Sequence, residues 1–287
     1  MVNQRMNSKT VYQKPRTHEK RWKQLVGPLV NTDGQDRLFL DLGCNAGFYM
    51  QKAVGLGYRA VGVEREPGFI AQAPKELEIV QGDVTLYQPP SSYLTLMACV
   101  HYHQADAKVE SILHQLFYST ANLLVMGRHK GRVTSKPDQK HLMRLLRGWD
   151  LVDSRKTDKF YTVLVKNRMV SEFDVEELYE NTVNHTKKVG GHTDFFEPFA
   201  EFVRRVSVGD KQEYDKTPFW AYLRKRGLRY RHGLCFWYEH LIEQSMRKGI
   251  DSMLINKGPV VIDGHHRLVI ARELGIKRLI SRSKWVK

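Results

Sequence analysis

The 287-residue sequence is poor in cysteine and has no long apolar run. Its 3 cysteines, Cys44, Cys99 and Cys235, include no CxxC pair, which disfavours a disulfide scaffold and a structural zinc finger. No stretch approaches about 18 consecutive apolar residues, so we expect no transmembrane segment. The first 22 residues are basic but lack an apolar core, which disfavours a secretory signal and predicts a cytoplasmic protein.

Acidic residues are also scarce relative to basic ones. The chain has 46 Lys and Arg against 31 Asp and Glu, a formal net charge of +15. Such a balance is typical of proteins that meet nucleic acid, an anionic membrane surface or phosphorylated ligands, and charge alone does not distinguish these partners. The 41% hydrophobic and 10% aromatic content suffices for packed cores and excludes global disorder.

From Arg37 onward, apolar strand-like runs alternate with helix-like segments. We predict strands at 38–43, 59–64, 77–83, 93–100 and 121–127, then a helix at 140–148 and an antiparallel hairpin at 150–167. This alternation predicts an α/β fold with a Rossmann-like doubly wound sheet over residues 37–168. Residues 1–36 are predicted to form a basic N-terminal arm or helix, because residues 1–26 hold seven basic side chains and one acid, Glu19.

The composition changes after Asn167. Residues 172–180 carry five acids, so we place a domain boundary near Met169. Beyond it we predict a smaller α+β domain over 169–287, with helices near 194–206 and 236–249, a strand at 258–264 and a helix at 267–275. The length of the chain agrees with two domains of ordinary size.

A glycine loop follows the first predicted strand. Residues 41–47 read Asp-Leu-Gly-Cys-Asn-Ala-Gly and open a helix, where glycine permits a sharp turn and close approach of a ligand. Glu64 ends the second strand, a place where a carboxylate accepts both hydroxyls of a ribose. Asp83 ends the third strand, where a carboxylate suits an adenine amino group.

This DxGxxxG, Glu64, Asp83 series resembles the class I S-adenosylmethionine-dependent methyltransferases over about residues 37–168. The resemblance implies S-adenosyl-L-methionine as the cofactor, bound by a loop that includes Asn45 and Gly47. It implies the methionine end at Asp41 and Gly43, the ribose at Glu64, and the adenine at Asp83 and Val84. The loop lacks GxGxxG, which disfavours a nicotinamide cofactor; a generic Rossmann-like turn stays open as the alternative.

The acceptor side is expected after the fourth strand, in residues 98–104. This segment has neither an Asn/Asp-Pro-Pro-aromatic tetrapeptide nor a Pro-Cys pair, which disfavours methylation of DNA bases. His101 and His103 instead resemble small-molecule and sugar methyltransferases, in which a histidine serves as base for a hydroxyl. A buried histidine satisfied by a neighbour and a metal-binding pair stay open, and Arg128, His129 and Lys130 suit an anionic acceptor or a solvated loop equally well.

A second motif, Asp263-Gly264-His265-His266-Arg267, lies between a β-branched strand and a helix. Helix-terminal amides beside an arginine and two histidines suit a phosphate, although a solvated helix cap stays open. The motif resembles the ParB/sulfiredoxin-like superfamily over about residues 235–280, whose G-x-x-R turn matches Gly264 and Arg267. The DGHHR form is closer to the small-molecule kinase branch and to proteins of surface-polysaccharide synthesis, which implies ATP, ADP or CTP with Mg²⁺.

Residues 216–232 combine six basic side chains with aromatic ones and contain no acid. The pattern suits single-stranded nucleic acid through stacking and phosphate contacts. It also suits an amphipathic helix that buries Trp220 and Leu223 and leaves its arginines in solvent. Of the two interpretations, we favour the amphipathic helix.

These features together predict a bifunctional enzyme. Its first domain would methylate, and its second would bind a nucleotide or transfer a phosphoryl group as a kinase does, so that a sugar, surface-polysaccharide or other small-molecule acceptor is capped. The alternative is a nucleic-acid-modifying methyltransferase whose basic second domain binds DNA or RNA. A third hypothesis is that the second domain senses a nucleotide and regulates the first.

Overall fold

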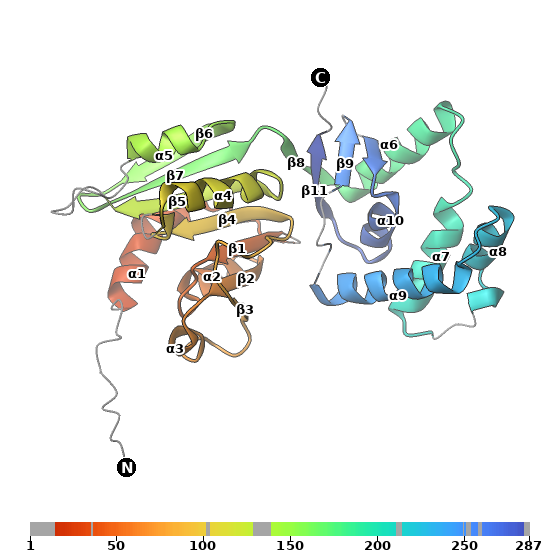
Figure 1. The fold of residues 1–287 in the computed structure, drawn as a ribbon, viewed down its shortest axis with the longest axis horizontal. Coiled ribbons are helices and arrows are strands. Elements are labelled where there is room, and N and C mark those ends of the chain that lie inside the picture. Colours follow the sequence, from red (N-terminus) through yellow and green to blue (C-terminus); the bar gives the residue numbers. More distant parts are fainter. Residues whose placement is uncertain are drawn as a thin grey trace, which may run out of the picture.

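The computed structural model describes residues 15–35, 37–101, 104–128, 139–210, 214–248, 250, 254–257 and 260–283. Within them the chain forms two units, each built on its own sheet (Figure 1). The units lie side by side along the long axis, and β8 and β11 are the strands of the second sheet nearest the first unit (Figure 1). None of the described helices is long and apolar enough to cross a lipid bilayer.

The first sheet has the order β3-β2-β1-β4-β5-β7-β6. Strands β1 to β5 are parallel, whereas β7 runs antiparallel to both β5 and β6. This confirms the doubly wound sheet, and the order reverses between β1 and β4, where such sheets open a crevice at the strands' carboxyl ends. The strands are β1 (Leu38–Leu42), β2 (Arg59–Glu64), β3 (Glu78–Gln81), β4 (Ser92–Ala98), β5 (Thr120–Arg128), β6 (Trp149–Lys156) and β7 (Phe160–Asn167).

Helices cover both faces of this sheet, because successive strand residues point to opposite sides. Leu40 packs on the side of α4 (Asp106–Phe117) and α5 (Gln139–Leu145), and Phe39 packs on the side of α2 (Phe48–Val54). The α2 side also buries Leu25 and Val26 from an N-terminal helical segment. That segment comprises α1 (Pro15–Arg21), a π-helix (Trp22–Val26) and a 3-10 turn (Gly27–Leu29); a short helix, α3 (Pro67–Ile70), follows β2.

The N-terminal segment is therefore part of the first unit over residues 15–30. Leu25 and Val26 are almost completely buried, and Lys52 of α2 forms an ion pair with Glu19 at 2.9 Å. Of the two forms predicted for this region, an arm or a helix, the described residues adopt the helix. Residues 1–14, which hold three of its basic side chains, lie outside the described residues.

The second sheet has the order β10-β9-β11-β8, with β9 and β11 parallel and the other pairs antiparallel. Asp174 ends β8 and caps α6 by accepting hydrogen bonds from the backbone amides of Glu176 and Glu177. The acidic run thus begins this unit with a strand and a capped helix. Its elements are β8 (Val170–Asp174), α6 (Val175–Lys188), α7 (Phe196–Ser207), α8 (Pro218–Lys225), α9 (Arg231–Lys248), β9 (Leu254–Lys257), β10 (Val260–Asp263), α10 (His265–Glu273) and β11 (Arg278–Ser283).

An aromatic core joins α7, α8, α9 and α10. Phe199, Phe202 and Phe219 are fully buried, and the Phe199 ring lies 5.0 Å from that of Tyr238. Helix α8 buries Phe219 and Leu223 and exposes Arg224 and Lys225, which confirms the amphipathic interpretation of this stretch. Trp220 is only half-buried, because it sits at the edge of that core.

The aromatic core gives a test of the second unit's stability. Replacing Phe199 by alanine removes a ring that packs on five other aromatic rings. We expect a loss of about 3–5 kcal/mol in the free energy of unfolding. Urea denaturation followed by far-UV circular dichroism measures it. Val208→Ala, at a side chain that is 80% exposed, serves as the control and should change stability by no more than about 0.5 kcal/mol. Equal losses in the two variants would contradict the core placement.

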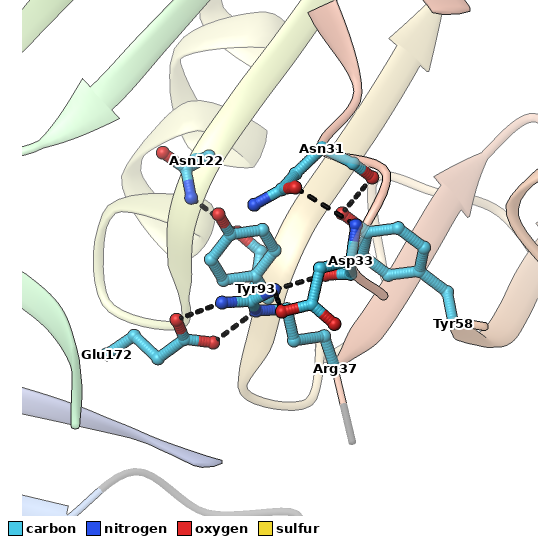
Figure 2. A network of polar contacts seen from close by, with 7 residues as sticks. All are labelled: Asn31, Asp33, Arg37, Tyr58, Tyr93, Asn122 and Glu172. Atoms are coloured by element: carbon cyan, nitrogen blue, oxygen red, sulfur yellow. Dashed lines mark hydrogen bonds and ion pairs between the residues drawn. The ribbon is translucent and has the colours of Figure 1, made fainter. Parts of the chain in front are cut away.

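An arginine links the two units at the start of β1. Arg37 binds Glu172 of β8 through two bonds, Nε to Oε1 at 2.6 Å and Nη2 to Oε2 at 2.7 Å (Figure 2). Its Nη1 donates to the carbonyl of Asp33, and its guanidinium lies 4.5 Å from the centre of the Tyr93 ring. The hydrogen bonds that Arg37 donates to Glu172 raise the pKa of Arg37, so the pair stays ionised although both side chains are largely buried.

Candidate cofactor site

A cavity of about 760 Å³ opens at the carboxyl ends of the parallel strands, where the strand order reverses. Five of the seven predicted cofactor residues line it, whereas Asp41 and Gly47 do not reach its wall. The wall also includes residues from α1 and from the segment after β4. Its lining includes Gly43, Asn45, Glu64, Asp83, Val84, His18, Arg21, Cys99, Val100, Gln104 and Met126.

The glycine loop is held close to the end of β2. Gly43 has a φ of 75°, and its amide and that of Cys44 donate to the carbonyl of Val63 at 2.8 and 3.1 Å. A Cβ at Gly43 would lie 2.6 Å from Cγ2 of Val100, so only glycine keeps the cavity open here. Gly47, at a φ of 76°, begins α2, and a Cβ there would lie 2.5 Å from Leu77, so its role is in packing.

Glu64 binds the loop through its carboxylate. Oε2 accepts from the backbone amide of Asn45 at 2.9 Å, and Oε1 accepts from those of Arg65 and Glu66 at 2.8 and 2.9 Å. An ionised carboxylate has about four acceptor positions, so three amides leave one for a ligand in the cavity. Glu64 therefore shapes the loop in addition to offering an acceptor at the place predicted for a ribose.

Asp83 presents an acceptor on the next strand along the sheet. Its Oδ1 accepts from the amide and the hydroxyl of Thr85, both at 2.8 Å, which leaves Oδ2 for a ligand. These bonds from Thr85 lower the pKa of Asp83, so the carboxylate is ionised near neutral pH. Val84 is buried beside it and supplies an apolar wall.

Asp41 lies beneath the loop and is fully buried. Neither of its carboxyl oxygens has a hydrogen-bond partner within the described part of the chain. Burial raises its pKa to about 8, and the negative charge of Glu64 adds to the shift. A buried carboxyl group without a partner is unusual in a native structure, and the raised pKa keeps this one protonated and uncharged at neutral pH in the free protein.

Of the two predicted acceptor-side histidines, the structure describes His101, which does not line the cavity. His101 is 1% exposed and its Nε2 lies 3.2 Å from the hydroxyl of Tyr161, whereas Val100 and Gln104 on either side of it line the cavity. These contacts fit the alternative of a core histidine satisfied by a neighbour. His103 lies outside the described residues, as do His129 and Lys130; Arg128 lies 5.9 Å from the Phe160 ring.

Sequence reasoning missed the N-terminal wall of the cavity. His18 and Arg21 of α1 line it, and the Arg21 guanidinium stacks 4.0 Å from the centre of the Phe160 ring. Burial, and then the charge of Arg21, lower the pKa of His18, so this imidazole is neutral at pH 7. The apolar residues of 22–30 were the available signal, because they show that the segment packs on the domain rather than in solvent.

The second motif adjoins a separate cavity of about 390 Å³. Gly264 has a φ of 95° and begins α10, and His265 and His266 reach the cavity wall beside Phe195, Tyr222 and Tyr238. Nε2 of His266 lies 2.8 Å from the Tyr238 hydroxyl, and the two rings stack with centroids 4.5 Å apart.

Burial changes the charge of this motif. It lowers the pKa of His266 to about 4 and also lowers that of His265, so both imidazoles are neutral at pH 7. Arg267 is left as the positive charge among the five residues, and its Nε is buried with no hydrogen-bond partner that the described residues provide. Asp263 is exposed at the end of β10. The two histidines thus belong to an aromatic cavity wall, whereas the positively charged Arg267 lies outside that wall.

Comparison with known proteins gives matches only among solved structures. No protein-family model matches the chain, and no curated protein matches it in sequence. An N-methyltransferase, NodS, from Bradyrhizobium japonicum is similar with 14% identity and a TM-score of 0.46, over 54% of this chain and 98% of its own. The magnesium protoporphyrin IX methyltransferase of Synechocystis, solved with bound S-adenosylmethionine, has 13% identity and a TM-score of 0.43, over 53% and 78%. An S-adenosylmethionine-dependent methyltransferase from Archaeoglobus fulgidus has 14% identity and a TM-score of 0.44, over 54% and 96%.

Proposed function

We propose that the chain is an S-adenosylmethionine-dependent methyltransferase whose first unit binds the cofactor in the 760 Å³ cavity. One observation carries this proposal. The cavity brings together a glycine turn and two carboxylates from three successive strands, and Glu64 and Asp83 each keep an acceptor for a ligand. Those acceptors match the hydroxyls of a ribose and the amino group of an adenine.

The cavity fits the cofactor from one end to the other. The adenosine part would lie between Glu64 and the Asp83–Val84 turn, and the methionine part would lie over Gly43, above the buried carboxyl group of Asp41. When bound, S-adenosylmethionine supplies a methyl group on a positively charged sulfur. The carboxyl group of Asp41 beneath that end of the cavity, when ionised, would favour a cationic ligand over an anionic one.

The acceptor would enter past Cys99, Gln104 and Met126, on the wall that continues from the end of β4. Gln104 offers both a donor and an acceptor, and Arg21 adds a cation, which suits a polar or anionic acceptor such as a sugar or the end of a surface polysaccharide. The residues of this wall hold the acceptor in line with the methyl group, which is the main task of such an enzyme. Removal of the acceptor's proton by His101 or His103 stays a proposal.

The second unit is proposed to bind a nucleotide or to transfer its phosphoryl group, in the manner of ParB/sulfiredoxin-like proteins. Aromatic side chains around the 390 Å³ cavity offer stacking surfaces for a base. Arg267, with the first amides of α10, offers donors to a phosphate. Phosphorylation and methylation of one acceptor would then cap it from two sites.

A second candidate function, modification of a nucleic acid, is favoured by a different surface. Tyr230, Phe236 and Trp237 are 84%, 67% and 51% exposed at the start of α9, beside the exposed Arg224 and Arg229. Exposed rings among arginines suit single-stranded nucleic acid. Binding of a single-stranded oligonucleotide that weakens steeply with salt, and weakens further in Trp237→Ala, would favour this candidate over a glycan acceptor.

Cofactor binding has a test at the glycine loop. Gly43→Arg places a side chain against Val100 in the cavity, and we expect binding of S-adenosylhomocysteine to be lost in isothermal titration calorimetry. Gly209→Arg is the matched control, because Gly209 has nearly the same φ, 74°, but nothing within 4 Å of its Cβ position. Retained binding in Gly43→Arg would contradict the cofactor assignment.

Cofactor binding should also depend on pH through Asp41. A cationic ligand over this carboxyl group favours its ionised form, whereas the free protein holds the proton below pH 8. Affinity for S-adenosylmethionine, whose sulfur is positively charged, should therefore rise by up to about tenfold per pH unit from pH 6 and level off near pH 8. Titration calorimetry between pH 6 and 8.5 measures this, and Asp41→Asn should remove the rise.

The raised pKa of Asp41 also predicts how the free energy of unfolding of the ligand-free protein changes with pH. Measuring that change serves as the control for the binding experiment. A carboxyl group whose folded-state pKa lies above its unfolded value of about 3.9 makes the protein less stable as pH rises from about 4 to 8. Asp41→Asn should therefore stabilise the free protein at pH 8 more than at pH 4. An affinity that is flat with pH, together with no such gain, would contradict the position given to Asp41.

The nucleotide proposal is tested at Arg267. ATP, ADP or CTP with Mg²⁺ at millimolar concentration should raise the melting temperature of the protein, and Arg267→Ala should abolish this shift. Arg224→Ala, at an exposed arginine of α8, is the control and should keep it. If no nucleotide shifts the melting temperature of the unaltered protein, the second unit has no such site.

A further inference from the structure

A third cavity, of about 300 Å³, lies between the two units. The first unit contributes Leu38, Arg59 and Tyr93, at or near the amino ends of β1, β2 and β4, and the second contributes Glu172 and Arg278 from β8 and β11. The glycine loop lies at the other end of β1, whose five residues span about 15 Å. This cavity is therefore distinct from both sites described above.

The charges on its wall are unbalanced. Arg37, Arg59 and Arg278 line the cavity, whereas Glu172 is the one carboxylate among its lining residues. Both oxygens of that carboxylate accept hydrogen bonds from Arg37, so its charge is already balanced (Figure 2). Arg59 and Arg278 form no ion pair with any residue that the structure describes, so two positive charges face the space without a counter-ion.

Arg59 carries the sharper signal. Its Nη1 is buried and has no hydrogen-bond acceptor among the described side chains and backbone. A buried donor without an acceptor costs free energy, and arginine donors suit the oxygens of a phosphate or a carboxylate. An anion held between Arg59 and Arg278 would accept a hydrogen bond from the buried Nη1 of Arg59 and would also balance the two positive charges.

Besides Ser91 and Tyr93, the rest of the wall is mostly aliphatic. Ile250, Ile276, Leu279 and Ile280 of the second unit face Leu38 of the first. A bare inorganic ion would leave these side chains against water, whereas the volume suits a compact organic molecule. The wall therefore matches a molecule with an anionic head and a small apolar body.

We propose that this cavity binds a small organic anion, with its phosphate or carboxylate head at Arg59 and Arg278 and its body against the isoleucines of the second unit. Because both units supply the wall, the ligand binds only while they are docked and stabilises that arrangement. Binding of such an anion would thus strengthen the contact between the two units. It does not depend on the methyltransferase proposal, since it uses no residue of that cavity.

Phenyl phosphate and phenylacetate are the probes, and they separate the two head groups. We expect at least one of them to bind the full chain in titration calorimetry at constant ionic strength. Arg59→Met and Arg278→Met should each weaken binding at least tenfold, whereas Arg147→Met, at an exposed arginine after α5, should not. Gly43→Arg should also keep phenyl phosphate binding, which distinguishes this site from the cofactor cavity.

Two further probes and one further measurement complete the experiment. Inorganic phosphate and benzyl alcohol should each bind at least tenfold more weakly than the better probe, because each lacks one half of the matching chemistry. That probe should slow amide hydrogen exchange in β8 and β11 of the unaltered protein and not in Arg278→Met, whose exposed side chain makes it the variant least expected to disturb folding. The proposal would be overturned by absence of binding at millimolar concentration. It would also be overturned if Arg59→Met and Arg278→Met bound the probe as tightly as the unaltered protein, or if inorganic phosphate bound as tightly as the better probe.

Discussion

The carboxylate of Glu64 is the interaction on which the first unit's site depends. Three backbone amides donate to it, one from the glycine loop and two from the turn after β2, so it joins the two segments that form the cavity floor. Its charge also adds to the raised pKa of Asp41 below. One buried acid therefore sets the shape of the loop and also contributes to the raised pKa of the neighbouring carboxyl group of Asp41.

Burial decides charge in the second unit as well. The sequence places two histidines and an arginine together, and on paper all three suit an anion. In the structure His266 stacks on Tyr238 and is neutral at pH 7, so it contributes an aromatic surface and a hydrogen bond. The positive charge rests on Arg267. The motif therefore presents an aromatic surface and one cation at different positions, in place of three positive charges at one point.

The surroundings of a side chain also decide the role of the arginines between the two units. Arg37 is neutralised by Glu172 and fixed by Asp33 and Tyr93, so it is a structural link. Arg59 lies on the wall of the same cavity without such a partner, and the difference comes only from where the nearest carboxylate lies. The chain's +15 charge is in this way divided among paired, solvated and unpaired groups with different consequences.

The sequence by itself determined the doubly wound order of strands and helices, the turn at Gly43 and the strand ends at Glu64 and Asp83. These follow from local periodicity and from the backbone conformation that glycine permits, which neighbouring residues encode. Only the tertiary structure decided that His101 points into the core while Gln104 reaches the cavity, and that α1 closes the cavity's side. It alone showed that Arg59 and Arg278, from different units, line one cavity. Such contacts depend on how distant segments pack against one another, and no local pattern carries that information.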